Sequence, residues 1–328
     1  MIDRIGQLFI TGFDGQLPSK EFLNFIATDN IGGVILFEGS CTPHHRAEET
    51  VRKVILSTGE IPFIAVDQEG GRVCRFKGAP AEYSSPADFG RENRLELFEE
   101  HFSRAVYYVR SLGVNLLLGP VADLRLNKNN KCLEGRTFGD NPARVIPFIE
   151  RAVKIAGRAG LLTCLKHFPG LGAAVEDPHL KLARADYDLQ VFLNRESLTF
   201  KAGIDAAADM VMTTHMILPK IDDKPATVSE MILNLLLREK LNFDGITITD
   251  DLLMKGIDDL GSYGERAMKA FAAGHDILLF GPNFHAAREA VAYFKNAYEK
   301  GLIDNERLNV SLDRISGIKS KLATSVII

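Results

Sequence analysis

Apolar and polar positions along the chain fall into blocks rather than alternating residue by residue. Short, continuously apolar runs recur between longer amphipathic stretches. Apolar runs of this length are typical of strands that are buried on both faces of a parallel sheet. The predicted strands are residues 8–12 (LFITG), 33–37 (GVILF), 63–67 (FIAVD), 115–120 (NLLLGP), 161–167 (LLTCLKH), 210–215 (MVMTTH), 246–250 (ITITD) and 276–280 (DILLF).

The stretches between these runs show helical periodicity, with apolar residues at steps of three and four. Helices are predicted over residues 94–113, 141–160, 228–243 and 305–322. Asn141 is followed by a proline and Ser229 precedes an apolar stretch, so both are placed to cap the start of a helix.

Strands that alternate with helices predict a (β/α)₈ barrel of the TIM type, an α/β fold, in a single domain over residues 1–328. Length alone would allow two domains, but α/β barrels of about 250 residues or more form one domain, and no linker or repeat interrupts the chain. The alternative is a doubly wound open sheet. That fold more often carries a GxGxxG turn after its first strand, and the chain has none.

Composition and charge narrow the classes of function. The chain is 46% hydrophobic with a formal net charge of −4 and no basic patch, which argues against disorder and against a nucleic-acid partner. Its four cysteines form no CxxC pair and are predicted to be free thiols in a reducing compartment. No run reaches about 18 apolar residues and the start lacks a signal-peptide pattern, so we expect a cytoplasmic protein without a membrane partner.

In a barrel of this kind, catalytic groups follow the carboxyl ends of the strands. Polar residues lie at such ends here: Asp67, Asp123, Lys166, His167, His215, Asp250 and Asp251. Asp250 ends its predicted strand and should point into the mouth of the barrel, where a carboxylate can act as nucleophile or base. The alternative is that one of the two adjacent aspartates caps the next helix.

Asp67 is followed by a glycine pair, Arg72 and Arg75, and a similar choice arises for Arg136 in the segment LEGRTFGD. A carboxylate accepts hydrogen bonds from hydroxyl groups and a guanidinium donates them in a fork, so these residues suit a hydroxyl-rich ligand. The alternative is a surface turn held by a salt bridge.

Residues 166–180, KHFPGLGAAVEDPHL, combine charged residues with a glycine-rich span. Lys166 and His167 end a strand. Asp177 lies two residues before His179 and can accept a hydrogen bond from one ring nitrogen, which raises the basicity of the other, as in an acid–base dyad. A zinc site would use the same groups, but a further ligand at 2–4-residue or i,i+4 spacing is lacking.

Seven ordered motifs resemble the β-N-acetylglucosaminidases of glycoside hydrolase family 3, and among them the single-domain cytoplasmic enzymes of bacterial peptidoglycan recycling. The motifs are GQLFITGFDG near the start, VDQEGGRV (66–73), GRTFGD (135–140), KHFPG (166–170), DPH (177–179), FDG (243–245) and TDDLLM (249–254). A further segment, AGHDILLF (273–280), continues the likeness.

The resemblance implies a retaining exo-β-N-acetylglucosaminidase that acts on muropeptide fragments and needs no cofactor or metal. Asp250 matches the nucleophile, His179 the acid/base and Asp177 its carboxylate partner. Residues that match those holding the N-acetylglucosamine unit are Asp67, Arg75, Arg136, Lys166 and His167. The small residues between Gly170 and Asp177 would let the histidine move over the sugar.

The chain departs from the family pattern twice. Leu171 stands where a second histidine is common, and Pro178 stands where serine is common; both put the exact substrate in doubt. Three alternatives remain open: a phosphorylase with the same covalent step, a β-glucosidase of the same family, and a sugar-binding protein without catalysis. A β-glucosidase usually carries its acid/base in a second domain. The protein partners and the oligomeric state are not predicted.

Overall fold

The fold is seen in a computed structural model that describes residues 1–78, 80–174 and 182–324. Its main sheet has eight strands in the order β12-β9-β7-β6-β3-β2-β1-β13, and its neighbouring strands are parallel. These strands are β1 (Phe9–Thr11), β2 (Gly33–Leu36), β3 (Phe63–Val66), β6 (Leu116–Leu117), β7 (Leu162–Phe168), β9 (Met210–Thr213), β12 (Ile246–Thr249) and β13 (Leu278–Phe280). Each of the predicted apolar runs contains or overlaps one of them.

The sheet closes on itself. The first strand pairs with the last, with Phe9 opposite Leu278, and a bridge from Ile248 to Ile277 joins β12 to β13. Closure confirms the predicted barrel and shows that the alternative of a doubly wound open sheet is wrong.

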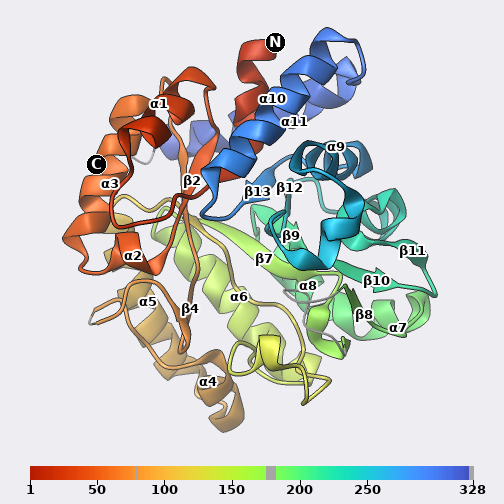
Figure 1. The fold of residues 1–328 in the computed structure, drawn as a ribbon. Coiled ribbons are helices and arrows are strands. Elements are labelled where there is room, and N and C mark those ends of the chain that lie inside the picture. Colours follow the sequence, from red (N-terminus) through yellow and green to blue (C-terminus); the bar gives the residue numbers. More distant parts are fainter. Residues whose placement is uncertain (79, 175–181, 325–328) are drawn as a thin grey trace.

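Helices surround the barrel (Figure 1). The longer ones are α1 (Lys20–Thr28), α3 (His45–Ser57), α5 (Leu95–Ser111), α6 (Pro142–Arg158), α8 (Glu196–Asp205), η5 (Ile232–Lys240), α9 (Tyr263–Ala273), α10 (Phe284–Glu299) and α11 (Asn305–Thr324). The predicted caps are confirmed, because the Asn141 side chain accepts from the Ala143 amide at 2.9 Å and Ser229 Oγ from the Ile232 amide at 3.0 Å. The helix predicted around Ile232 forms, but with the wider π-type hydrogen bonding.

Short elements that were not predicted from the sequence extend the carboxyl ends of the barrel strands. A hairpin of β4 (Gln68–Gly70) and β5 (Val73–Cys74) follows β3. A small sheet combines β8 (Ala183–Arg184), β10 (Met216–Leu218) and β11 (Asp222–Pro225). Gly70 turns the hairpin with φ of +89°, and a Cβ there would lie 2.5 Å from the Ser84 carbonyl oxygen, so only glycine fits. The shorter helices are η1 (Ile2–Leu8), α2 (Glu38–Cys41), α4 (Pro86–Glu92), η2 (Lys131–Leu133), η3 (Leu171–Ala173), α7 (Leu189–Asn194), η4 (Ala226–Val228) and η6 (Lys255–Leu260).

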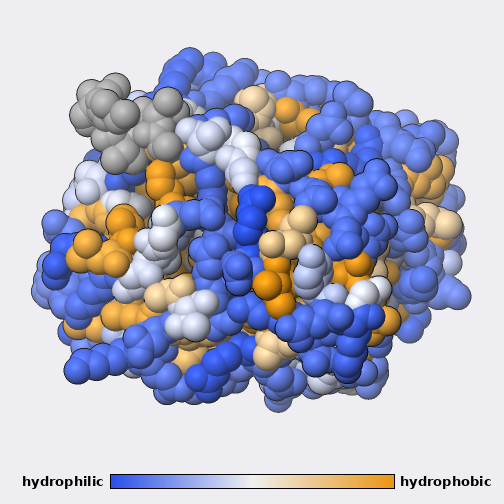
Figure 2. All heavy atoms as spheres, turned by 90° about the horizontal axis from the view of Figure 1, so that it is seen from above, coloured by the Kyte–Doolittle hydropathy of each residue, from blue (hydrophilic) through white to orange (hydrophobic). Residues whose placement is uncertain are grey.

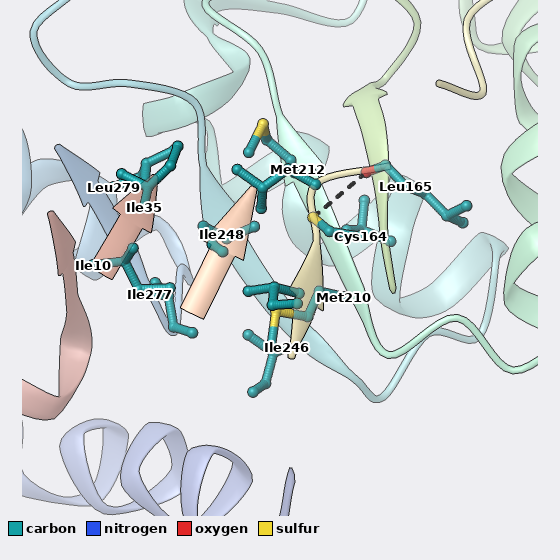
Figure 3. Close-up of a cluster of buried hydrophobic side chains, with 14 of the residues drawn as sticks. Ile10, Ile35, Cys164, Leu165, Met210, Met212, Ile246, Ile248, Ile277 and Leu279 are labelled. Atoms are coloured by element: carbon teal, nitrogen blue, oxygen red, sulfur yellow. Dashed lines mark hydrogen bonds between the residues drawn. The ribbon is translucent and has the colours of Figure 1, made fainter. Parts of the chain in front are cut away.

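The barrel interior is packed with aliphatic and sulfur-containing side chains from neighbouring strands (Figure 3). Ile10, Ile248 and Met212 are among those buried there. Cys164 adds a thiol to this layer, and burial raises its pKa well above the usual range. All four cysteines are free, as predicted, and the structure shows that all four are buried. The interior is therefore a solid core, and the space for a ligand lies at the ends of the strands.

A charged cluster lies at the opposite end of the barrel, where the strands begin. The buried carboxylate of Asp276 lies within 3.4 Å of the guanidinium groups of Arg238, Arg307 and Arg314 and accepts a hydrogen bond from Ser311.

On the outside, hydrophilic residues cover most of the face in Figure 2 and apolar patches are scattered among them. Among the described helices, none combines the length and the apolar character that a membrane crossing requires.

Candidate functional site

A cavity of about 410 Å³ opens at the carboxyl ends of the barrel strands. It brings together six of the residues proposed from the sequence, namely Asp67, Arg75, Arg136, Lys166, His167 and Asp250. Arg72, Lys131, Leu171 and Asp251 also line it. The other two proposed residues, Asp177 and His179, lie outside the described residues.

Lys166 is the centre of the charged network in this cavity. The residue is 2% exposed, and its Nζ lies 2.7 Å from Asp67 Oδ1 and 2.7 Å from Glu69 Oε1. Arg75 reaches the other oxygen of Asp67 at 3.2 Å. Burial alone would raise the pKa of Asp67, but the charges of Lys166 and Arg75 outweigh it and hold the pKa below its usual value. The carboxylate of Asp67 is therefore kept ionised.

Glu69 joins Lys166 to Arg136 and was not proposed from the sequence. Its two oxygens accept a bidentate pair from Arg136, with Nε at 2.7 Å and Nη2 at 2.8 Å. Burial opposes ionisation of Glu69, but Arg136 and Lys166 lower its pKa far below normal. The available signal was spacing: Asp67 and Glu69 are two residues apart in an extended segment, and such residues share one face.

Asp123 holds His167. Its Oδ2 accepts from the His167 backbone amide at 3.0 Å and from Nδ1 at 2.7 Å, while Oδ1 accepts from the Leu171 amide at 2.6 Å. Because an ionised carboxylate can only accept, Nδ1 carries a proton in this pair. The ring is thereby fixed with Nε2 at 3.4 Å from Arg136 Nη2.

The two adjacent aspartates after β12 differ in their contacts. Asp251 Oδ1 accepts from the backbone amides of Leu253 at 2.9 Å and Gly281 at 2.8 Å, so Asp251 holds the turn. Asp250 Oδ1 accepts from the Asp251 amide at 2.8 Å, and the half-buried residue lines the cavity. His215, another polar residue at a strand end, is fully buried and contacts the Asp251 carbonyl oxygen through Nε2 at 2.9 Å. It supports the backbone of this turn and is not among the lining residues.

The rest of the cavity wall is mixed. Leu171 is 1% exposed and adds an apolar surface where the family pattern often has histidine. Arg72 donates to the carbonyl oxygens of Glu134 and Lys131 at 2.8 and 2.9 Å and so fixes the loop opposite the hairpin. Within the described ranges, no three His, Cys, Asp or Glu side chains are grouped so that they could hold a metal ion.

Residues 1–318 match the family model described as "Glycosyl hydrolase family 3 N terminal domain". A beta-hexosaminidase of Xanthomonas campestris pv. campestris is 31% identical over 278 residues, covering 83% of this chain and 83% of the relative. Beta-hexosaminidase A of Pseudoalteromonas piscicida is 31% identical over 341 residues, covering 93% of this chain and 56% of the relative.

A solved structure of a glycoside hydrolase family 3 beta-N-acetylglucosaminidase from Paenibacillus sp. superimposes with a TM-score of 0.92 at 28% identity. The superposition covers 99% of this chain and 63% of that one. This chain thus spans only a little over half of the Pseudoalteromonas enzyme and under two thirds of the Paenibacillus enzyme. Both likenesses nevertheless extend over nearly the whole of this chain. The chain belongs to the family of glycosyl hydrolase family 3 N-terminal domains.

Proposed function

We propose that this protein is a retaining exo-β-N-acetylglucosaminidase that forms a covalent glycosyl-aspartate at Asp250. The observation that carries the proposal is the position of Asp250 in the same cavity as the network of Arg75, Asp67, Lys166 and Arg136. One half-buried carboxylate faces a set of charged donors and acceptors that suits a sugar.

The network supplies the contacts that a sugar needs. Asp67 is ionised and accepts from hydroxyl groups, and Arg75, Lys166 and Arg136 donate to hydroxyl or amide oxygens. Their mutual ion pairs hold these groups in place before the ligand arrives, so little side-chain entropy is lost on binding. The apolar face of Leu171 offers a surface for the ring or the acetyl methyl group.

The contacts of the carboxylates that line the cavity favour a different residue as the general acid/base. Asp67 has a lowered pKa between two cations and is a poor proton donor. Asp251 is held by two backbone amides. With Asp250 as nucleophile, no lining carboxylate in the described part of the chain is left to protonate a leaving group. A separate acid is required, and His179 with Asp177 is the pair that the sequence offers.

The reaction then has two steps. His179 protonates the glycosidic oxygen as Asp250 attacks the anomeric carbon, which breaks the bond to the aglycone and leaves the glycosyl-aspartate. His179 next takes a proton from water, which attacks the anomeric carbon and releases the sugar with the original configuration and Asp250 as carboxylate. Asp177 orients the imidazole and stabilises its charged form.

The proposed substrate is a muropeptide fragment, N-acetylglucosamine linked to 1,6-anhydro-N-acetylmuramic acid, processed in the cytoplasm during peptidoglycan recycling. The names of the beta-hexosaminidase relatives support a hexosaminide substrate, and the resemblance of the motifs supports the muropeptide. The second candidate function is a phosphorylase, in which phosphate takes the place of water in the second step. The observation in its favour is Lys131, an exposed cation on the cavity lining with no ion pair among the described residues.

One assay separates these functions. We expect turnover of 4-nitrophenyl N-acetyl-β-glucosaminide, with the β-anomer of N-acetylglucosamine as first product in proton NMR. Addition of phosphate should leave that product unchanged. Formation of N-acetylglucosamine 1-phosphate would establish the phosphorylase, and preferred turnover of the 4-nitrophenyl β-glucoside would replace the proposed substrate class. No turnover of either glycoside, with retained N-acetylglucosamine binding, would indicate a sugar-binding protein.

A further inference from the structure

A second cavity, of about 230 Å³, lies beside the segment that carries Arg136. Its walls come from α4, from the residues after Asp123, and from the first turn of α6. The lining residues are Ala87, Gly90, Arg91, Arg125, Lys128, Thr137, Phe138, Gly139, Asp140 and Arg144. None of them lines the first cavity, so this is a separate feature of the surface.

The second cavity is strongly cationic. Arg91 is paired with Asp88 on its own helix. The other three cations of the lining, Arg125, Lys128 and Arg144, form no ion pair with a carboxylate in the described part of the chain. Asp140 is the single acid among the described residues of the lining. Three cations against one carboxylate leave a surplus of two positive charges in a protein whose formal net charge is −4.

Arg125 also carries an unsatisfied donor. Its Nη2 donates to the Lys128 carbonyl oxygen at 2.9 Å and its backbone amide to the Gly139 carbonyl oxygen at 2.7 Å. Its Nε is buried and has no acceptor within the described ranges. A buried donor without an acceptor is destabilising, so the contacts within the protein leave part of the hydrogen-bonding capacity of the Arg125 guanidinium unused.

The cavity is connected to the first site through the backbone. Gly139, which accepts from the Arg125 amide, is three residues beyond Arg136. The Gly135 carbonyl oxygen accepts from the Ala87 amide of α4 at 3.3 Å. Lys128 lines the second cavity and Lys131 the first, and three residues span at most about 11 Å. A short stretch of chain thus joins the walls of the two cavities.

We propose that this second cavity is an anion-binding subsite for a carboxylate or phosphate group, held by Arg125 and Arg144 with Lys128. Guanidinium groups bind such oxyanions through parallel N–H donors, and the surplus charge offsets the loss of hydration of the anion. The oxyanion can come from a free small anion or from an acidic group attached to the aglycone of the glycoside. The second source rests on the proposed function, and the first does not.

The first arm of the test titrates inorganic phosphate into the protein by calorimetry, with N-acetylglucosamine saturating the first cavity and ionic strength held constant. We expect binding that Arg125→Gln/Arg144→Gln weakens at least about tenfold, because each substitution removes charge-assisted hydrogen bonds to the anion. The control Arg52→Gln/Arg158→Gln removes the same charge from exposed positions on α3 and α6 and should bind phosphate as the wild type does. No binding, or equal affinity in both double variants, overturns the proposal.

The second arm measures KM for N-acetylglucosaminides with and without an acidic peptide on the aglycone. With a tethered oxyanion, Arg125→Gln/Arg144→Gln raises KM for the peptide-bearing substrate about tenfold and leaves KM for the 4-nitrophenyl glycoside unchanged. With a free oxyanion, phosphate binding is lost but both KM values stay the same. Unchanged 4-nitrophenyl turnover shows that the variant is folded. Lack of turnover by the wild type defeats the proposed function but leaves the phosphate titration valid.

Discussion

The carboxylate of Asp123 accepts two hydrogen bonds from His167, at 3.0 Å from the backbone amide and at 2.7 Å from the ring Nδ1. One side chain therefore sets both the backbone and the imidazole of a residue in the first cavity. Asp123 is 1% exposed, so this arrangement is shielded from water.

Asp123→Asn should disturb sugar binding more than chemistry, because it frees the His167 ring to rotate and to change tautomer. We expect KM for the 4-nitrophenyl glycoside to rise about tenfold, with a smaller change in kcat. Substitution of a residue that orients a histidine ring typically has an effect of this size. ¹⁵N NMR of the His167 ring should show loss of the single Nδ1-protonated form. Asp313→Asn, at an exposed position on α11, is the control. Unchanged KM and tautomer would show that Asp123 acts only in folding.

Glu69→Gln should destabilise the fold, because it removes the charge that compensates the buried Lys166 and Arg136. Breaking a buried ion pair by removing one partner costs about 3–5 kcal/mol. Urea unfolding measures this loss. The matched control is Glu38→Gln, which breaks the exposed pair with Lys77 and should cost less than about 1 kcal/mol. Equal effects of the two variants would mean that the buried network contributes no more to stability than an exposed ion pair.

Asp250→Asn should abolish turnover and leave the fold intact. The asparagine oxygen can still accept from the Asp251 amide, so the turn is kept while the nucleophile is lost. We expect kcat to fall by about 10⁴-fold or more, with N-acetylglucosamine affinity within a few-fold by calorimetry. Asp251→Asn is the neighbouring comparison. If Asp250→Asn remained active and Asp251→Asn did not, the nucleophile would be the second aspartate.

His179→Ala should slow the natural disaccharide much more than the 4-nitrophenyl glycoside, because a sugar alkoxide needs a proton to leave and 4-nitrophenolate does not. General acid help is worth about 10² to 10⁴ in rate. Water attack on the glycosyl-enzyme should also slow, and azide, which needs no base, should restore that step. Asp177→Asn should show a milder form of the same defect. Equal losses on both substrates without azide rescue would place His179 in binding or folding.

His275 should make the stability of the fold decrease as the pH falls. The residue is fully buried, and burial together with Arg307 and Arg238 lowers its pKa to about 3, although Asp276 opposes the shift. Below pH 6.5 the unfolded chain binds a proton that the folded chain does not. The stabilisation by neutral His275 is thus complete above that pH and is lost as the pH falls toward 3, at up to about 1.4 kcal/mol per pH unit.

Urea unfolding at pH 7.5 and pH 5 measures this dependence. Between them the wild type should lose about 2 kcal/mol more than His275→Gln, which has no imidazole to protonate. His45→Gln, on the exposed start of α3, should keep the wild-type dependence. An identical pH dependence in wild type and His275→Gln would contradict the assignment.

The sequence was sufficient to predict the barrel, because its strands are buried on both faces and therefore read as continuous apolar runs. The end of a strand is also visible in a sequence, so Asp67, Lys166 and Asp250 could be expected near one another. The separation of Asp250 and Asp251 into a cavity residue and a turn residue depended on which amides each contacts. That information exists only in three dimensions.

The partners of the predicted residues could not be found in the same way. Glu69 pairs with Arg136, 67 residues later, and Asp123 with His167, 44 residues later. No local pattern marks such pairs. The second cavity could not be predicted for the same reason, because Arg91, Arg125 and Arg144 come from three segments that meet only in the fold. The roles of Asp177 and His179 stay predictions.

The pairing of β1 with β13 has a consequence for synthesis of the chain on the ribosome. The partner of β1 on one side lies near the carboxyl end, and Gln7 and Lys319, joined at 2.6 Å, are 312 residues apart. At about 5–20 residues per second, the open side of β1 waits on the order of tens of seconds for β13 to be made. During that time β1 has unpaired amides and carbonyls that another nascent chain could bind. Yield during expression should therefore depend on how well chaperones shield this amino-terminal segment before the barrel closes.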